Sequence, residues 1–241
     1  MKNIIVSLLL LLCGTAASVA ESEEYSVLVG DFTKIKVVDP IDVVYKYVPD
    51  SVGYAFFQSE AHGADVLTFS NSNGTLRIEL SKDADPKSAP VVYVSARFLG
   101  EVENSSTGTV TVLSPAPAVE FKATVVGNGR IVASGLNPTK VEASIKTGNG
   151  NIVLSGECQA ARFNMLGTGV IQADELKAQD VSCRIMGSGQ IGCWPVVSLQ
   201  SKGIGSTKIY YKGEPERLRK SGGGKLLRLD SADAETLGQE E

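Results

Sequence analysis

The sequence predicts an all-β protein built as a parallel β-helix, a solenoid with coils of about 20 residues. Two observations carry this prediction. A glycine-x-glycine motif recurs six times between residues 127 and 224, and apolar residues alternate with polar ones on both sides of it. A fixed period near twenty residues is typical of stacked units, and alternation is the pattern of strands with one buried face. One coil cannot bury its own apolar edge, so such units are stable only as a stack.

The glycine motifs are predicted to be the structural corners of the coils. Their first glycines are separated by 21, 19, 20, 16 and 19 residues. Paired glycines let a chain turn through backbone angles that other residues rarely adopt. The motifs are Gly127-Asn128-Gly129, Gly148-Asn149-Gly150, Gly167-Thr168-Gly169, Gly187-Ser188-Gly189, Gly203-Ile204-Gly205 and Gly222-Gly223-Gly224. The first four motifs have an isoleucine two residues past the second glycine. In the fifth motif the isoleucine comes later, at Ile209, so we expect a local distortion there.

Other interpretations of these glycines fail on their context. A dinucleotide site needs a third glycine and a following helix, and a phosphate loop needs a lysine followed by serine or threonine. The calcium-binding β-roll needs aspartates at fixed positions, where this chain has Arg130, Asn151, Val170 and Gln190. The motifs therefore indicate structure and no cofactor.

Each coil is expected to be a strand, a glycine corner, a second strand, a short corner and a third short strand or bend. The residues expected to point inward before the glycines are Phe121, Ala123, Val125, Ala143, Ile145, Ala161, Phe163, Met165, Val181, Cys183 and Ile185. Those after them are Ile131, Ala133, Ile152, Leu154, Ile171, Ala173, Ile191 and Cys193, and a third inward position falls at Leu136, Cys158, Leu176 and Val196. Their burial would offset much of the entropy that folding costs.

The chain divides into four segments. Residues 1–20 are predicted to be a signal peptide, because Lys2 precedes the apolar run Ile4–Leu12 and Ser18-Val19-Ala20 resembles a cleavage site. Residues 21–112 have strand patterns without clean glycine corners, and are interpreted as an irregular first part of the solenoid or, alternatively, as a separate β-domain. Residues 113–229 form the regular β-helix, and 230–241 an acidic tail.

The signal peptide predicts an exported protein in the periplasm, at the cell surface or secreted. Lipid anchoring at Cys13 is the alternative, although Leu12 stands where a small residue is normally required. No other apolar run is long enough to be a transmembrane segment. Of the remaining cysteines, Cys158, Cys183 and Cys193 are expected to pack as buried free thiols, with a Cys183–Cys193 disulfide as the alternative.

Composition excludes several classes of function. The formal charge is −4 and the chain has a single histidine, His62. Without a basic excess we expect no nucleic-acid partner, and with one histidine we expect no histidine-based metal site or catalytic dyad. The acids Glu120, Glu142, Glu157, Asp174, Glu175 and Asp180 form no tight cluster, so a polysaccharide-degrading enzyme, which needs paired carboxylates, is the third-ranked interpretation.

Function is therefore expected on the outward side chains. Lys122, Ser144, Asn164, Arg184 and Lys202 are predicted to form one column, which could follow an anionic glycan or another chain. Ser134, Ser155, Asp174, Trp194 and Tyr210 form a second, in which Trp194 could stack on a sugar ring. Ligand binding is assigned to Trp194, Tyr210, Asp174, Lys122, Arg184 and Lys202, against the alternatives of a solvated face and a covered tryptophan.

The residues also resemble a known family. Phe32-x-x-Ile35-x-Val37, the pair Leu76 and Ile78, and the units Gly127-Asn128-Gly129-Arg130-Ile131 and Gly187-Ser188-Gly189-Gln190-Ile191 are similar to the auto-transporter adhesin, head GIN domain family, found largely in Bacteroidetes. The resemblance covers nearly the whole mature chain. It implies an exported right-handed β-helix with no catalytic residues to transfer.

Together these features predict a non-catalytic adhesin or binding module for a glycan or a surface protein. A structural envelope component without a ligand is the alternative. Self-association through the ends or faces of the solenoid would be compatible with either.

Overall fold

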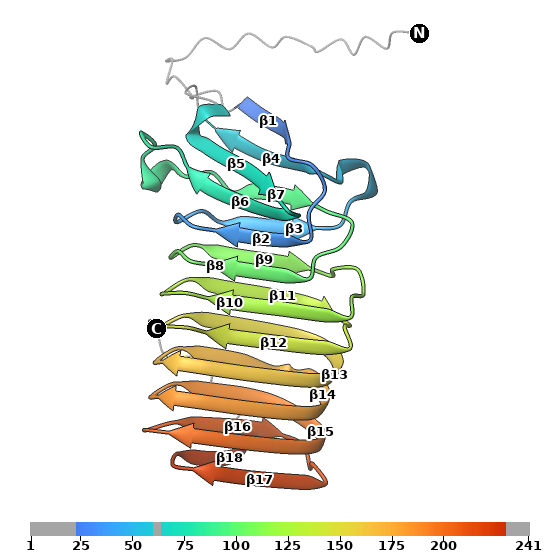
Figure 1. Ribbon diagram of the computed structural model, residues 1–241, viewed down its shortest axis with the longest axis vertical. Helices are drawn as coiled ribbons and strands as arrows, with labels where there is room; N and C mark the ends of the chain where they lie inside the picture. Colours follow the sequence, from blue (N-terminus) through green and yellow to red (C-terminus); the bar gives the residue numbers. More distant parts are fainter. Residues whose placement is uncertain (1–22, 60–63, 230–241) are drawn as a thin grey trace, which may run out of the picture.

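The computed structural model describes residues 23–59 and 64–229, and its strands form one hydrogen-bonded β-solenoid (Figure 1). Nearly all of the regular structure is strand, and these two segments contain no α-helix. Several sequence predictions lie outside the described residues. They concern the signal peptide 1–20 with Cys13, the acidic tail 230–241, and His62.

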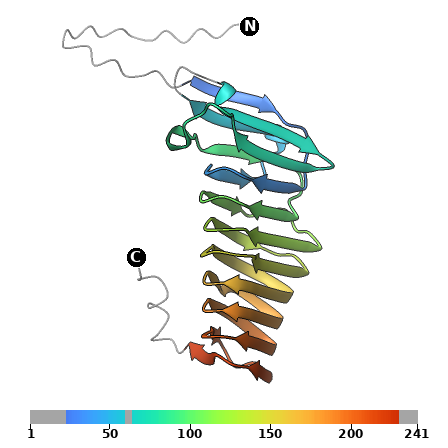
Figure 2. The same cartoon turned by 60° about the vertical axis from the view of Figure 1, so that its left-hand side comes forward.

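Two parallel ladders of strands make up most of the stack, and antiparallel strands lie at its N-terminal end (Figure 2). The first ladder contains β2 (Lys34–Val37), β8 (Glu101–Asn104), β10 (Glu120–Val125), β12 (Lys140–Ile145), the second halves of β13 (Asn151–Gly167), β14 (Val170–Gly187) and β15 (Gln190–Ile204), and β17 (Arg217–Gly222). The second ladder contains β3 (Val43–Lys46), β9 (Thr109–Leu113), β11 (Arg130–Leu136), the first halves of β13, β14 and β15, β16 (Lys208–Lys212) and β18 (Lys225–Leu229).

A short third side closes the most regular coils. Within the long strands, residues 155–158 pair in parallel with 175–178, and Lys177 and Ala178 pair with Trp194 and Pro195. The predicted third inward residues Leu136, Cys158 and Leu176 are buried, whereas Val196 is only half-buried and Pro195 is buried beside it. The predicted coil of two strands and a third short strand is confirmed here.

The core consists of columns of like side chains, one from each coil. Ile131, Ile152, Ile171, Ile191 and Ile209 occupy the same rung position on successive coils, and all are buried. Every other inward residue predicted on the two main strands between Phe121 and Cys193 is buried as well. Backbone hydrogen bonds hold neighbouring coils about 4.8 Å apart, so identical side chains pack on each other and fill the interior.

The two glycines of a corner have different roles. Gly167, a first glycine, has a φ of 135°, which a side chain disfavours. A Cβ there would also lie 2.7 Å from the Gly148 carbonyl oxygen on the preceding coil. Gly129, a second glycine, has no such backbone angle, but a Cβ there would lie 2.7 Å from the Ser106 carbonyl oxygen. The first position needs glycine for its conformation, and the second needs it because the coils are in contact.

The fifth motif departs from the predicted alignment. Gly203 pairs with Ile185 inside the first ladder, which places Gly205, with a φ of 100°, at the corner position that Gly187 occupies one coil earlier. Ile209 is nevertheless in register with Ile191 and buried. The expected distortion is therefore a shifted corner, and the core column continues through it.

The N-terminal coils do not follow chain order. The coil of β2 and β3 lies between the coil of β8 and β9 on one side and that of β6 (Thr75–Leu80) and β7 (Val92–Ser95) on the other (Figure 1). Antiparallel β1 (Glu23–Leu28), β4 (Tyr54–Ser59) and β5 (Leu67–Ser72) complete this end of the stack. They cover the first coil and leave fewer of its backbone groups unpaired.

Three 3₁₀ turns in the described residues belong to this end, η1 (Pro49–Ser51), η2 (Ala64–Val66) and η3 (Pro86–Ser88).

Candidate functional site

The outward face of the first ladder carries columns of polar side chains. Ser144, Asn164, Arg184 and Lys202 are in register on β12 to β15, as predicted, but Ser144 is buried and is not part of an exposed column. Lys122 is not in this column, because it pairs with Glu142 and Thr124 occupies the position opposite Ser144. The hydrogen-bonded register between strands determines which residues form a column. The number of residues between a strand position and its glycine corner varies from coil to coil, so that spacing alone does not identify the column.

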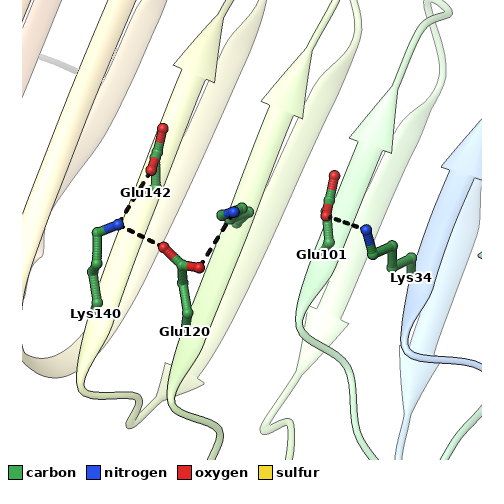
Figure 3. Close-up of polar contacts among 6 residues, drawn as sticks. Lys34, Glu101, Glu120, Lys140 and Glu142 are labelled. Atoms are coloured by element: carbon green, nitrogen blue, oxygen red, sulfur yellow. Dashed lines mark hydrogen bonds and ion pairs between the residues drawn. The ribbon is translucent and has the colours of Figure 1, made fainter.

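Ion pairs cover the N-terminal half of this face (Figure 3). Lys34 contacts Glu101 at 3.0 Å, and Lys36 contacts Glu103 at 2.7 Å. Lys140 contacts Glu120 at 2.6 Å and Glu142 at 3.5 Å, while Lys122 contacts the other oxygen of Glu120 at 3.3 Å. Cations and anions alternate from one strand to the next, so this half of the face neutralises itself.

Two carboxylates of this face, Glu120 and Glu103, are held ionised. Hydrogen bonds from Lys140 and then Lys122 lower the pKa of Glu120. At Glu103, burial acts to raise the pKa, but hydrogen bonds from Lys36 and Ser105 outweigh it and the pKa is lowered. A general acid for glycoside hydrolysis requires the opposite shift. These acids are thus suited to ion pairing and poorly suited to proton donation.

The C-terminal half of the same face is different, and we call it the cationic face. Its cations alternate with neutral polar residues, and Asp180 is the acid among them. It consists of the outward residues Arg162, Arg184, Lys202, Arg217 and Arg219, with Asn164, Ser182 and Gln200 between them. Arg217 lies 4.0 Å from Asp180, whereas the other four cations make no ion pair within the described part of the chain.

An apolar column borders the cationic face. Leu166, Met186 and Ile204 are in register on β13, β14 and β15, and their exposed fractions are 47%, 46% and 53%. Each lies two residues beyond Asn164, Arg184 or Lys202 on its strand, so it points to the same side of the sheet. The cationic face therefore has an apolar edge beside the glycine corners.

Two adjoining shallow hollows lie on this face. One of about 280 Å³ is bordered by Lys140, Arg162 and Asp180, and one of about 230 Å³ by Arg217 and Arg219. They share Ser198 and Gln200. Arg162 and Arg219 are functional candidates that the sequence analysis missed. The strand alternation that placed Asn164 outward also places Arg162 outward, and this signal could have identified it.

The second predicted column does not form. Ser155 pairs with Glu175 and not with Asp174, because the register shifts next to Ala173. Tyr210 pairs with Gly192, and Trp194 pairs with Lys177. Asp174 leans toward Gly192, where an added Cβ would lie 3.2 Å from its Oδ1 atom. Bulges at the second corner thus separate residues that the spacing alone had aligned.

Trp194 is half-buried on the third side of the coil and interacts with two lysines. The Lys212 ammonium lies 4.4 Å from the centre of the indole ring and the Lys177 ammonium 5.8 Å from it. Such cations over the ring face are attracted by its π electrons. Tyr210, by contrast, is half-buried on the second ladder.

All three cysteines of the described part are buried free thiols, and no disulfide joins Cys183 to Cys193. Burial raises the pKa of Cys158 to about 11. A hydrogen bond with Cys183 and then burial raise the pKa of Cys193, whose thiol also donates to the Tyr210 carbonyl oxygen at 3.5 Å. At neutral pH the Cys158 and Cys193 thiols are therefore protonated and have little nucleophilic character.

Between residues 23 and 229, apart from 60–63, histidine, cysteine and acidic side chains form no group of three that could hold a metal ion. The same residues include no helix with the length and apolarity of a membrane span.

The fold and its faces place this chain in the class of β-solenoid proteins with a polar outer surface. Residues 31–215 match the model of a family described as "Putative auto-transporter adhesin, head GIN domain". The chain belongs to this family. No curated protein matches it.

Solved structures from Bacteroidetes share the fold. One is a "putative adhesin" from Bacteroides fragilis, with a TM-score of 0.78 and 21% identity, over 87% of this chain and 97% of that one. Another "putative adhesin", from Parabacteroides merdae, has a TM-score of 0.69 and 20% identity, over 88% and 98%. A "putative lipid binding protein" from Parabacteroides distasonis has a TM-score of 0.60 and 19% identity, over 88% and 98%.

Proposed function

We propose that this chain is an exported, non-catalytic binding module whose cationic face holds an extended acidic glycan. Its place of action would be the periplasm, the cell surface or the surrounding medium. The adhesin names of the family and of two structural neighbours support a binding role. Glu120, which is paired with two lysines and has a lowered pKa, supports a role without catalysis.

One observation carries the proposal, which is the change of charge pattern along a single face. Lys34, Lys122 and Lys140 are neutralised by neighbouring glutamates, whereas Arg162, Arg184 and Lys202 are not. Arg184 and Lys202 are directly opposite each other on neighbouring strands, about 4.8 Å apart, so each can meet a carboxylate or sulfate of a linear polymer, and Arg162 lies diagonally from Arg184 on the preceding coil. The neutral amides and hydroxyls between them can bind sugar hydroxyl groups.

The test compares two double variants on the same face. Arg184→Ala with Lys202→Ala removes two unpaired cations, and Lys34→Ala with Lys122→Ala removes two ion-paired ones as a matched control. Binding to immobilised polygalacturonate and heparin, with dextran as the neutral polymer, is measured at low and high salt. We expect the first variant to lose about tenfold or more in affinity, because a hydrogen bond to a charged group contributes about 1.5 kcal/mol or more. The control should change less than about threefold.

Equal losses in the two double variants, or no binding to either acidic polymer, would contradict the proposal. Trp194→Ala belongs in the same series. Trp194, Tyr210 and Asp174 lie off the cationic face, so their loss should leave acidic-glycan binding unchanged. If Trp194→Ala weakened acidic-glycan binding, the binding site would instead lie on the third side of the coil.

An anionic lipid surface is the second candidate, and the exposed column of Leu166, Met186 and Ile204 favours it. Cations beside exposed apolar side chains are suited to anionic head groups. The lipid-binding name of one structural neighbour is compatible with this ligand. Met186→Ser should weaken co-sedimentation with phosphatidylglycerol vesicles if lipid is the ligand. If a glycan is the ligand, it should leave polygalacturonate binding nearly unchanged.

A further inference from the structure

A groove of about 370 Å³ lies at the opposite end of the solenoid from the cationic face, on the antiparallel strands. It is lined by Glu24, Phe56, Phe57, Gln58, Val91 and Tyr93, and we call it the aromatic groove. Strand alternation explains its composition. Ala55 and Phe57 point into the core and are buried, so Tyr54, Phe56 and Gln58 point outward.

Two outward rings, the exposed Tyr93 and the half-buried Phe56, form one side of the aromatic groove. Phe56 and Tyr93 are directly opposite each other on β4 and β7, a separation of about 5 Å between Cβ atoms in such pairs. Tyr54 stacks beside Phe56, with ring centres 6.2 Å apart and planes inclined by 28°. Tyr93 is 54% exposed. Neighbouring exposed apolar side chains rimmed by polar residues are typical of ligand-binding grooves.

Polar side chains form the other side. Glu24 and Gln58 are opposite each other on β1 and β4, and both are exposed. Neither makes a side-chain hydrogen bond within the described residues. A wholly apolar partner would remove this carboxylate and amide from water without replacing their hydrogen bonds, which is costly. The occupant must therefore present an apolar surface to the rings and hydroxyl or amide groups beside it.

We propose that the aromatic groove binds a pyranose ring of an uncharged glycan. One face of such a ring consists of C–H groups and suits Tyr93 and Phe56, and its equatorial hydroxyls suit Glu24 and Gln58. A volume near 370 Å³ is at the lower end of the range for small-molecule sites and suits a short saccharide. This site is separate from the cationic face and does not depend on the function proposed for that face.

The test is titration calorimetry of the full chain with hexasaccharides of glucose, mannose, xylose and N-acetylglucosamine. At least one should bind, and Tyr93→Ala should weaken it at least about fivefold, because a ring contact contributes about 1 kcal/mol. Tyr93→Phe keeps the ring and should bind within about twofold of the wild type. Tyr47→Ala removes an exposed ring outside the groove, and Arg184→Ala with Lys202→Ala alters only the cationic face, so neither should affect these saccharides.

Gln58→Ala provides a second variant at an exposed position, should Tyr93→Ala prove unstable by thermal denaturation. It should also weaken the saccharide that binds. Failure of every hexasaccharide to bind would overturn the proposal, and so would binding that survives both Tyr93→Ala and Gln58→Ala. A dimer in light scattering that Tyr93→Ala dissociates would also overturn it, because the groove would then be a contact between two copies of the chain.

Discussion

The Lys36 ammonium lies 2.7 Å from the Glu103 carboxylate and joins β2 to β8, two strands that are neighbours in the stack and distant in the chain. The ion pair is only about one-third exposed on each side. It therefore contributes to holding the displaced N-terminal coil in place.

This ion pair predicts a dependence of stability on pH. The Glu103 pKa is lowered in the folded protein, so its contribution is complete above the unfolded value near 4.3 and is lost as the pH falls through the folded value. Urea unfolding should show a falling free energy below about pH 4.5. Glu103→Gln should reduce that fall by up to about 1 kcal/mol. Glu216→Gln, at an exposed position without an ion pair in the described chain, is the control and should behave as the wild type.

The corner glycines predict large and position-specific losses of stability. Gly167→Ala combines an unfavourable φ with a backbone contact, and Gly129→Ala places a methyl group against Ser106. Each should lower the free energy of unfolding by about 2 kcal/mol or more. Gly223→Ala is the matched control, because its Cβ would meet its nearest neighbour at 3.8 Å. Urea titrations decide the matter, and equal small effects at all three positions would contradict the stacked-corner explanation.

The buried thiols predict slow chemistry in the folded state. With Ellman's reagent at pH 8, Cys158, Cys183 and Cys193 should react within minutes only after denaturation, since all three are buried and the Cys158 pKa is about 11. A chain that keeps its first twenty residues has Cys13 as an additional thiol. If only Cys158 of the three reacts in denaturant, a Cys183–Cys193 disulfide has formed and the free-thiol state is wrong.

The contact between Lys212 and Trp194 predicts a measurable coupling. A double-mutant cycle with Trp194→Leu and Lys212→Met should give an interaction energy of about 0.5–1 kcal/mol in urea unfolding. Lys177→Met with Trp194→Leu serves as the comparison, and its coupling should be smaller because its ammonium is farther from the ring. Coupling of the same size in both cycles would show that distance from the ring is not the determinant.

The final coil predicts how the solenoid avoids growing by end-to-end pairing. Lys220 pairs with the buried Ser201, so it occupies an inward position, yet it is exposed because β15 is the one strand that pairs with β17 among the described residues. An inward-pointing charge on an edge strand opposes the addition of another strand. Lys220→Val should therefore raise the mass seen in sedimentation velocity at high protein concentration. Lys202→Val, which points outward one coil earlier, should leave it unchanged.

The sequence predicted the regular half of the molecule in some detail. Strand alternation is a local property, so Ile131, Ile152 and Ile171 could be assigned to one column from their distances to the glycines. The same reasoning misplaced Lys122 and separated Trp194 from its actual neighbours. Those assignments depend on the number of residues in each corner. That number is determined by hydrogen bonding between neighbouring coils. Gly203 shows the same effect, because Gly205 takes the corner position in its place.

The amino-acid sequence by itself determined the period, the inward rows and the need for glycine at the bends, because these follow from local backbone chemistry and from alternation along one strand. Only the tertiary structure decided that β2 and β3 lie between later coils, that cations gather unpaired on one half of a face, and that Tyr93 lies opposite Phe56. Each of these depends on the register between strands distant in the chain, and the free energy that fixes it comes from packing of the whole stack.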